Sequence, residues 1–442
     1  MKRLFDTYAY GEEPRSGCWW DETEKPILRP VLQEAARTDV AIIGAGFTGL
    51  SAALHLAQAG ISVTVLDADR VGWGASGRNG GFCCLGGGMA SDAMLDRRFS
   101  VEGRIDFRRT ELAAVQLVGK LIQENGLDVD RHSNGETVLA HRAKDLVSLT
   151  EDAATLRQNY GVAHQLYGKE ELAEQGMDGP FRGALTIDAG FALNPRKYVN
   201  GLAKAAEAKG AHIYEKSAVT LLEPQLDGWR LRINGHALHA DQVIVATNGY
   251  SSEDLPPWLG GRYMPSQSNV IVTRPLSEDE LAAAGWTSAQ MAYDTRNLLH
   301  YFRLMPDRRF LFGMRGGVLT GQAAEARASS KIRRDFEQMF PAWKSVETSH
   351  SWSGMVCLAR DMLPFVGAVP AVKGLWTGMC YHGNGVAMGS YSGALLASLV
   401  QDKQPEMLYP EAMRAPLRRF ELGRFRRAVM PFAYAGLMLA DI

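Results

Sequence analysis

Residues 39–67, DVAIIGAGFTGLSAALHLAQAGISVTVLD, contain the pattern that decides the fold class of this chain. The apolar run at 39–43 is typical of a strand that is buried on both faces of a sheet. From Leu50 onward, apolar residues recur at the spacing of one helical face, and Gly60 suits the position that ends such a helix. The β-branched run at 62–66 predicts a second strand. The stretch therefore predicts a β-α-β unit within an α/β fold.

A glycine-rich turn, GAGFTG at 44–49, joins the first strand to the helix. In such a turn Gly44 permits the tight bend, Gly46 lets the backbone approach a pyrophosphate, and Gly49 lets the helix pack close to the strand. The helix N-terminus presents free N–H groups and the positive end of its dipole to phosphates. This context favours a dinucleotide site over a glycine turn of another α/β protein. The residues assigned to the site are Gly44, Gly46, Phe47, Thr48 and Gly49.

An acidic residue, Asp67, closes the second strand. It lies roughly 20 residues beyond the glycine turn, where a carboxylate accepts hydrogen bonds from ribose hydroxyls. A carboxylate there disfavours a 2′-phosphate, so FAD or NAD fits better than NADP. We assign Asp67 and its neighbour Ala68 to the cofactor site.

The loop GASGRNGG at 74–81 favours FAD over NAD. It has too little side chain to fill a core, and it suits a backbone that passes close to a second part of a large cofactor. The alternative is a flexible surface loop. The loop residues assigned to the cofactor are Gly74, Ala75, Ser76, Arg78, Asn79 and Gly80.

Four motifs together resemble the D-amino-acid-oxidase superfamily, and within it the branch that contains gamma-glutamylputrescine oxidase. They are GxGxxG at 44–49, GASGRNGG at 74–81, ATNGY at 246–250 and GMCYHGNGV at 378–386, in that order. The resemblance implies a Rossmann-like FAD-binding domain interleaved with an α+β substrate domain built on an antiparallel sheet. It also implies oxidation of a small, gamma-glutamylputrescine-like amine at its C–N bond to an imine and then an aldehyde, with reduction of oxygen, as in polyamine catabolism.

The same resemblance assigns further cofactor contacts. Val219 resembles the residue whose backbone contacts adenine, and Gly249 belongs to the third motif. Covalent relatives carry a cysteine near Cys357, but it aligns with Gly354, so the resemblance implies non-covalent FAD. The loop whose N–H groups would face the flavin pyrimidine ring contains Gly383, Asn384, Gly385 and Val386.

A second domain is indicated by strand-like runs at 269–274, 298–305 and 310–314. The last two flank the turn signal at 306–307, which predicts a hairpin. Antiparallel strands inside a parallel pattern suggest a domain that the chain enters and leaves, and the polar stretch 92–180 predicts a helical insertion. We divide the chain into an FAD-binding domain (38–90, 191–255 and 350–402), a substrate domain (91–190 and 256–349) and a C-terminal arm (403–442).

The two carboxylate anchors of related enzymes are missing from this chain. Relatives that oxidise α-amino acids carry an arginine in a W-x-G-x-R-P stretch, and the corresponding residue here is Val356. Relatives that oxidise sarcosine use a lysine whose place is taken by Ala387. Burial of a carboxylate without a partner is costly. This argues against glycine, D-amino acids and sarcosine, and it favours an amine whose carboxylate, if any, lies far from the reacting nitrogen.

Candidate catalytic residues are Tyr301 and Arg303, on one face of the predicted hairpin, and His382, which precedes the Gly383–Gly385 turn. His300, on the other hairpin face, and Arg360 and Tyr381, beside the flavin loop, are further candidates for specificity. Each also suits an ordinary structural role. Flavin amine oxidation needs little acid–base equipment, because the cofactor carries the chemistry. We therefore expect no catalytic triad.

Composition excludes several classes. The net charge of −1 gives no general attraction to nucleic acid, and the five cysteines form no CxxC pair, so neither a metal site nor a disulfide framework is expected. The start of the chain has no apolar signal region, and no apolar run is long enough to span a membrane. A cytoplasmic location fits best.

The C-terminal stretch 411–442 combines several arginines with the apolar run PFAYAGLML. Such a segment can lie on an anionic membrane, but we favour an arm packed on the same molecule or on a dimer mate. Membrane contact would make a quinone a plausible electron acceptor. Two functional alternatives stay open: an amine or amino-acid dehydrogenase that passes electrons to a quinone or an electron-transfer protein, and a flavoprotein that binds partners and holds FAD only structurally.

Overall fold

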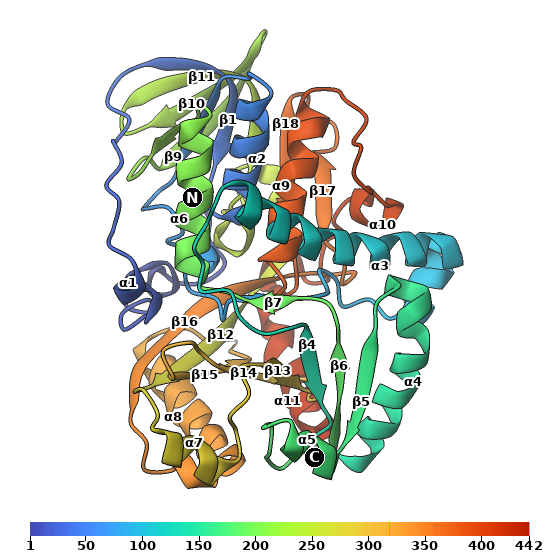
Figure 1. The fold of residues 1–442 in the computed structure, drawn as a ribbon. Coiled ribbons are helices and arrows are strands. Elements are labelled where there is room, and N and C mark those ends of the chain that lie inside the picture. The colour runs from blue at the N-terminus through green and yellow to red at the C-terminus, as the bar shows by residue number, and fades with distance from the viewer. Residues whose placement is uncertain (318, 442) are drawn as a thin grey trace.

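The computed structural model describes residues 1–317 and 319–441 and contains two large sheets, one above the other (Figure 1). The strands of the upper sheet are β1 (Ala36–Ile43), β2 (Val63–Leu66), β8 (His212–Tyr214), β9 (Val219–Gln225), β10 (Gly228–Ile233), β11 (His236–Val245), β17 (Phe365–Ala368) and β18 (Leu375–Met379). Their order is β17-β18-β11-β1-β2-β8, and β10 and β9 continue from β11 as a ribbon. β1 pairs in parallel with β11 and β2, which confirms the predicted β-α-β unit.

β1 is buried on both faces because its alternate side chains enter two different cores. Val40 and Ile42 pack in a core that includes Leu50 of the following helix. Ala41 and Ile43 pack in a second core. This explains why the strand has a continuous apolar run instead of an alternating one.

Three helices lie together on the upper sheet: α2 (Phe47–Gln58), α6 (Pro195–Ala208) and α9 (Ala387–Val400). α2 contacts both of the others. Gly60 follows α2 with φ +77°, a conformation that favours glycine, as its predicted helix-ending position requires. Asn194 caps α6 by accepting hydrogen bonds from the backbone N–H groups of Arg196 and Lys197, and Pro195 is its first residue. These ends are the ones that the residue types predict.

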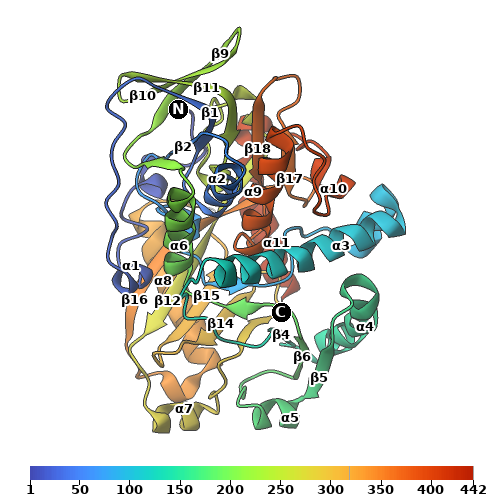
Figure 2. The ribbon, with the colours of Figure 1, turned by 45° about the horizontal axis from the view of Figure 1, so that its top comes forward.

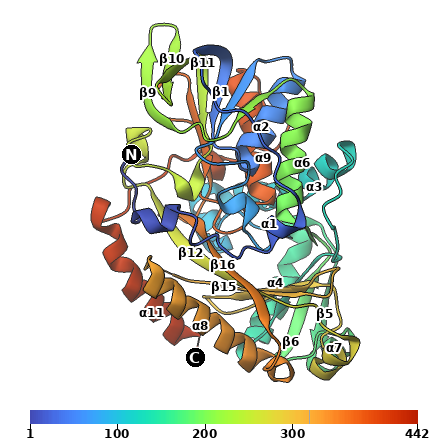
Figure 3. The same cartoon turned by 90° about the vertical axis from the view of Figure 1, so that its left-hand side faces the viewer.

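The lower sheet is largely antiparallel. Its strands are β4 (Glu136–Leu139), β5 (His164–Gly168), β6 (Gly183–Ile187), β12 (Tyr263–Thr273), β13 (Met291–Asp294), β14 (His300–Leu304), β15 (Phe310–Arg315) and β16 (Thr348–Ala359). Their order is β16-β12-β15-β14-β13-β4-β6-β5. β14 and β15 form the predicted antiparallel hairpin. α7 (Glu278–Ala284) and α8 (Gln322–Met339) lie below this sheet in Figure 3.

The prediction of a helical insertion at 92–180 is incomplete. The segment contains α3 (Asp92–Glu124), α4 (Ala143–Tyr160) and α5 (Lys169–Glu174), but it also supplies β4 and β5 to the lower sheet. β4 pairs in parallel with β13, far later in the chain, and antiparallel with β6. A local pattern carries no information about such a distant partner. Figure 2 shows α3 passing beside the upper sheet and α4 beside β5.

The C-terminal arm, which includes α10 (Glu411–Arg414) and α11 (Met430–Ala440), packs on the same molecule. The Asp441 carboxylate accepts hydrogen bonds from the backbone N–H groups of Asn297 (2.8 Å) and Leu298 (3.3 Å). The hydroxyl of Tyr434 hydrogen-bonds that of Ser266 on β12. Among the described residues, no helix is both long and apolar enough to cross a membrane. Three further short elements are α1 (Trp20–Thr23), β3 (Phe82–Cys83) and β7 (Phe191–Ala192).

Candidate functional site

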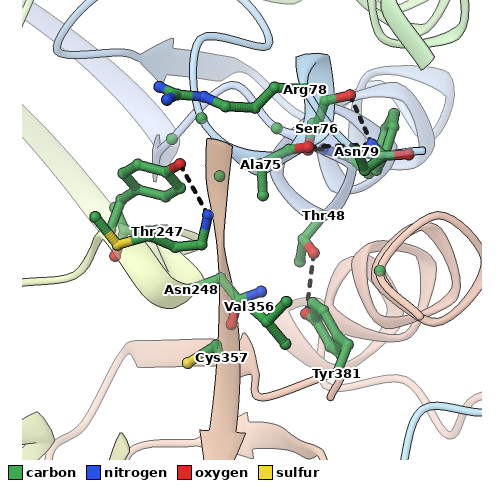
Figure 4. Close-up of a pocket in the computed structure, with 18 of the residues that line it drawn as sticks. Thr48, Ala75, Ser76, Arg78, Asn79, Thr247, Asn248, Val356, Cys357 and Tyr381 are labelled. Carbon is green, nitrogen blue, oxygen red and sulfur yellow. Dashed lines mark hydrogen bonds between the residues drawn. The ribbon is translucent and has the colours of Figure 1, made fainter. Parts of the chain in front are cut away.

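A cavity of about 680 Å³ reaches from the glycine turn of the upper sheet to the hairpin of the lower sheet. This volume is in the usual range for sites that bind small molecules and cofactors. Figure 4 shows part of its wall: the loop with Ala75, Ser76 and Asn79 lies on one side, and Val356 and Tyr381 lie on the other. The cavity therefore joins elements from both sheets.

The glycine turn leaves room for backbone only. Gly44 has φ +110°, and a Cβ atom there would lie 2.8 Å from the carbonyl oxygen of Ala246. A Cβ on Gly49 would lie 2.0 Å from the carbonyl oxygen of Gly44, so the turn and α2 can pack this closely only with glycine. The backbone N–H of Phe47, at the start of α2, donates to Ser76 Oγ at 3.0 Å. This hydrogen bond ties the glycine turn to the 74–81 loop.

Asp67 lines the cavity with its carboxylate held by the backbone. Its Oδ2 accepts from the N–H of Ala45 at 2.8 Å and its Oδ1 from that of Asp69 at 2.9 Å. Burial raises the pKa of Asp67 to about 6 despite these hydrogen bonds. Donors such as ribose hydroxyls would favour the charged form, so the site suits a ribose.

Arg78 and Asn79 shape the 74–81 loop. Asn79 Nδ2 donates to the carbonyls of Ala75 and Ser76, both at 3.1 Å, and its Oδ1 accepts from the N–H of Gly81 at 2.8 Å. Arg78 donates from Nε and Nη2 to the carbonyl of Trp73, at 3.1 and 2.9 Å. Both side chains border the cavity, and their hydrogen bonds hold the loop in place.

The 381–386 loop forms the opposite wall. Tyr381 and Thr48 join the two walls by a hydroxyl–hydroxyl hydrogen bond of 2.9 Å (Figure 4). His382 Nε2 accepts from the backbone N–H of Ala359 at 3.3 Å, so the ring proton of the neutral imidazole lies on Nδ1. Burial, with a contribution from Arg315, lowers the pKa of His382 to about 3. A neutral ring that already accepts at Nε2 is poorly suited to take a proton from a substrate.

The cavity gathers most of the cofactor residues that the sequence assigns. Gly49 and Gly249 are not in its lining. The assigned residues that line it are Gly44, Gly46, Phe47, Thr48, Asp67, Ala68, Gly74, Ala75, Ser76, Arg78, Asn79, Gly80, Val219, Gly383, Asn384, Gly385 and Val386.

Tyr301 and Arg303 share a face of β14 but occupy different places. Tyr301 lines the cavity, and its hydroxyl hydrogen-bonds Ser268 Oγ at 2.9 Å. Arg303 is buried outside the lining and donates to the carbonyls of Gly80 (3.0 Å) and Leu193 (2.8 Å). Its guanidinium therefore holds the Gly80 segment from behind and does not face the cavity.

Arg360 and His300 also lie outside the cavity lining. Arg360 pairs with Glu421 at the surface, with 2.7 Å between Nη2 and Oε1. His300 lies in a buried charge cluster, where its Nδ1 is 3.0 Å from Asp294 Oδ2 and its Nε2 is 3.1 Å from Asp335 Oδ2. Burial alone would lower the pKa of His300, but the two carboxylates outweigh this effect and raise it.

We expect His300→Gln to reduce stability more at acidic than at alkaline pH, by about 1.5–3 kcal/mol where histidine is charged. The raised folded-state pKa means that the stabilisation is fully present below the ordinary value of 6.5 and is lost as the pH rises through the folded-state value. Urea unfolding of both proteins at about pH 5.5 and about pH 9 measures it. A stability gap that stays constant across this range would contradict the role of the charge cluster.

Several cavity residues were not identified from the sequence. Arg315, Tyr293 and Ser268 line the end that the lower sheet provides, and Tyr250 lines the wall near the 74–81 loop. Arg315 is the last residue of β15, one position beyond the strand-like run at 310–314 that predicts this strand. A predicted strand that extended to residue 315 would have included Arg315 in the hairpin.

The described residues contain no cluster of histidine, cysteine or carboxylate side chains that could hold a metal ion. All five cysteines are free and buried. Cys357 lines the cavity, and its Sγ lies 3.6 Å from that of Cys380.

An α/β sheet with this glycine turn and carboxylate, opening through one cavity onto an antiparallel sheet, defines a dinucleotide-binding protein with a separate substrate layer. Residues 39–399 match the family model described as FAD dependent oxidoreductase. The chain therefore belongs to this family of FAD-dependent oxidoreductases, and FAD is its cofactor. The residues present fit FAD, because the turn at Gly44 admits only backbone and the cavity continues past the 74–81 loop to the 381–386 loop.

The chain is similar to other oxidoreductases over most of its length. The chain is 30% identical to a probable oxidoreductase OrdL of Rhizobium meliloti over 96% of this chain and 97% of that protein. It is also 30% identical to gamma-glutamylputrescine oxidoreductase of Escherichia coli over 84% of this chain and 85% of that protein. The structure of glycine oxidase from Geobacillus kaustophilus superposes with a TM-score of 0.70 at 21% identity, covering 87% of this chain and 100% of that one, and shows that the fold is shared.

Proposed function

We propose that the protein oxidises a small, gamma-glutamylputrescine-like amine at its C–N bond. The amine would become an imine, which water hydrolyses to an aldehyde and a released amine or ammonia, and oxygen would be reduced to hydrogen peroxide. The observation that carries the proposal is the continuity of the cavity, which runs from the glycine turn to a pocket lined by Tyr293, Tyr301 and Val356. FAD, when bound, supplies the acceptor for the two electrons lost from the amine carbon.

In this proposal the chain mainly orients the substrate and excludes water. The aromatic rings of Tyr293 and Tyr301 form an apolar wall, and the Tyr301 hydroxyl offers a polar contact beside Ser268. His382 stays neutral and helps to shape the 381–386 loop. Arg303 acts as a positioning residue for the Gly80 segment. The assigned lining residues of the glycine turn, the 74–81 loop and the 381–386 loop would hold the cofactor.

The uncharged residue at position 356 favours a substrate that is not a simple α-amino acid. Val356 lines the cavity at the position where relatives that oxidise α-amino acids carry an arginine. Ala387, at the position of the sarcosine-binding lysine, is buried at the start of α9 and has an uncharged side chain. Neither position can pair with a carboxylate.

The visible spectrum of the purified holoprotein, recorded without oxygen before and after addition of amines, tests the proposal. We expect gamma-glutamylputrescine to bleach the flavin band. Sarcosine and D-alanine should bleach it at least about tenfold more slowly. Absence of bleaching by every amine would reject the proposed oxidation and favour structural FAD. Admission of air then identifies the acceptor: fast recovery of the band supports oxygen, and slow recovery supports a quinone or an electron-transfer protein.

A further inference from the structure

Arg315 is a cationic side chain on the wall of the cavity, beside the loop that follows His382. It ends β15, next to Ser268 on the paired strand β12. A Cβ atom on Gly383 would lie 2.4 Å from Arg315 Nη2, so the guanidinium lies directly against this glycine. Gly383 also has φ +107°, and the close approach is a second reason for glycine at this position.

The guanidinium of Arg315 makes no hydrogen bond or ion pair with any residue that the structure describes. The ionisable groups around it are Cys84, His382 and three tyrosines, Tyr301, Tyr293 and Tyr434, none of which is an anion at neutral pH. The carboxylates in the cavity lining are those of Asp67 and Asp69, at the end of β2 in the upper sheet. The hairpin end of the cavity therefore has a cation without a fixed anion.

Such a cation favours an anionic ligand. Arg315 is half-buried, so its guanidinium loses part of its hydration on the cavity wall, and a carboxylate matches its planar fork with two parallel hydrogen bonds. Arg303 and Arg360 do not line the cavity, because Arg303 donates to backbone carbonyls and Arg360 pairs with Glu421.

We infer that Arg315 binds a carboxylate of the substrate, so that the substrates are amines that also carry a carboxylate and not simple diamines. The inference rests on the proposed function. It replaces the two missing anchors by a third one, which enters the cavity from a different strand. A diamine such as putrescine carries only positive charges and would meet Arg315 with no acidic partner at this end of the cavity.

The test compares ligands that differ only in charge, bound to the FAD-loaded protein without turnover. Butanoate and butanamide form one pair, and pentanoate and pentanamide form a second, and none of the four carries an amine that the flavin could oxidise. Dissociation constants come from perturbation of the flavin spectrum and from calorimetry. We expect wild type to prefer each carboxylate, and Arg315→Met to bind carboxylates about 100-fold more weakly with amides unchanged. Arg315→Lys should lose about tenfold, because a lysine keeps the charge without the fork.

Arg360→Met is the matched control, since it removes a surface arginine that is paired outside the cavity, and it should leave the preference unchanged. Equal binding of butanoate and butanamide by wild type would overturn the inference even if Arg315→Met fails to fold. A change in flavin reduction potential in Arg315→Met without a change in ligand preference would also overturn it, because Arg315 would then act on the cofactor. If Arg315→Met loses carboxylate binding but no amine reduces the flavin of the wild type, the inference stands and only the proposed oxidation is rejected.

Discussion

Replacement of Gly44 by valine is expected to yield a protein that purifies without FAD. Residue 44 has φ +110°, which a β-branched side chain tolerates poorly, and its Cβ would lie 2.8 Å from the carbonyl oxygen of Ala246. Relief of this contact moves the turn into the space that the dinucleotide needs. The absorbance ratio of the flavin band to the protein band measures FAD content, and we expect it to fall at least about tenfold.

Gly60→Val provides the matched control for this substitution. Gly60 also has a positive φ, +77°, but a Cβ there meets nothing within 4 Å and the residue is not part of the cavity lining. Both variants share the backbone strain, of about 1–3 kcal/mol, so only the loss of FAD distinguishes them. At 100 times the dissociation constant, bound FAD adds about 2.7 kcal/mol of stability, and Gly44→Val should lose this as well. Equal FAD content in the two variants would show that the turn does not form the cofactor site.

The β-α-β unit could be predicted from the sequence because its signals are local. The buried strand at 39–43, the glycine turn and the helix that ends at Gly60 all lie within one short stretch. The same holds for the start of α6, where Asn194 supplies the cap within three residues of its partners. Elements whose ends are determined by neighbouring residues are the ones that sequence patterns locate best.

The strands of the lower sheet were harder to predict because their partners are remote. β4 is only four residues long and pairs with β13, which follows it far along the chain. β5 is an edge strand with mostly exposed side chains, so it has no apolar alternation to reveal it. The polar stretch that contains both strands therefore resembled a helical insertion.

In the candidate site, too, the sequence predicted local features but not the contacts between remote parts of the chain. The alternation of residues along a strand correctly placed Tyr301 and Arg303 on one face, but it could not show which of the two side chains reaches the cavity. The carbonyls of Gly80 and Leu193 lie beside the Arg303 guanidinium, while Tyr301 reaches the cavity. The place of Arg315 depends on its approach to Gly383, which belongs to a loop far along the chain. Tertiary packing determines the surroundings of such side chains, and the periodicity of the sequence does not reveal them.

Phe302→Ala is expected to give the largest loss of stability among single substitutions near the site. Phe302 lies in β14 between Tyr301 and Arg303, with its own side chain fully buried in the opposite direction. It stacks on Phe312 at 5.6 Å and on Phe181 at 5.9 Å, and Trp286 meets it edge-on at 5.2 Å. Removal of such a ring costs about 3–5 kcal/mol, because the rigid aromatic neighbours cannot close the cavity that is left.

The thermal midpoint of the FAD-loaded protein, with KM for the amine, measures the effect. A loss of this size should lower the midpoint by at least about 5 °C. KM should rise as well, because the strand that carries Tyr301 into the cavity loses its support from behind. Phe432→Ala is the control, since Phe432 on α11 is 79% exposed and should change stability by less than about 0.5 kcal/mol. A raised KM with an unchanged midpoint would mean that Phe302 acts on the site by contact, whereas a lowered midpoint with an unchanged KM would mean that the hairpin keeps its place through β15 and β12 alone.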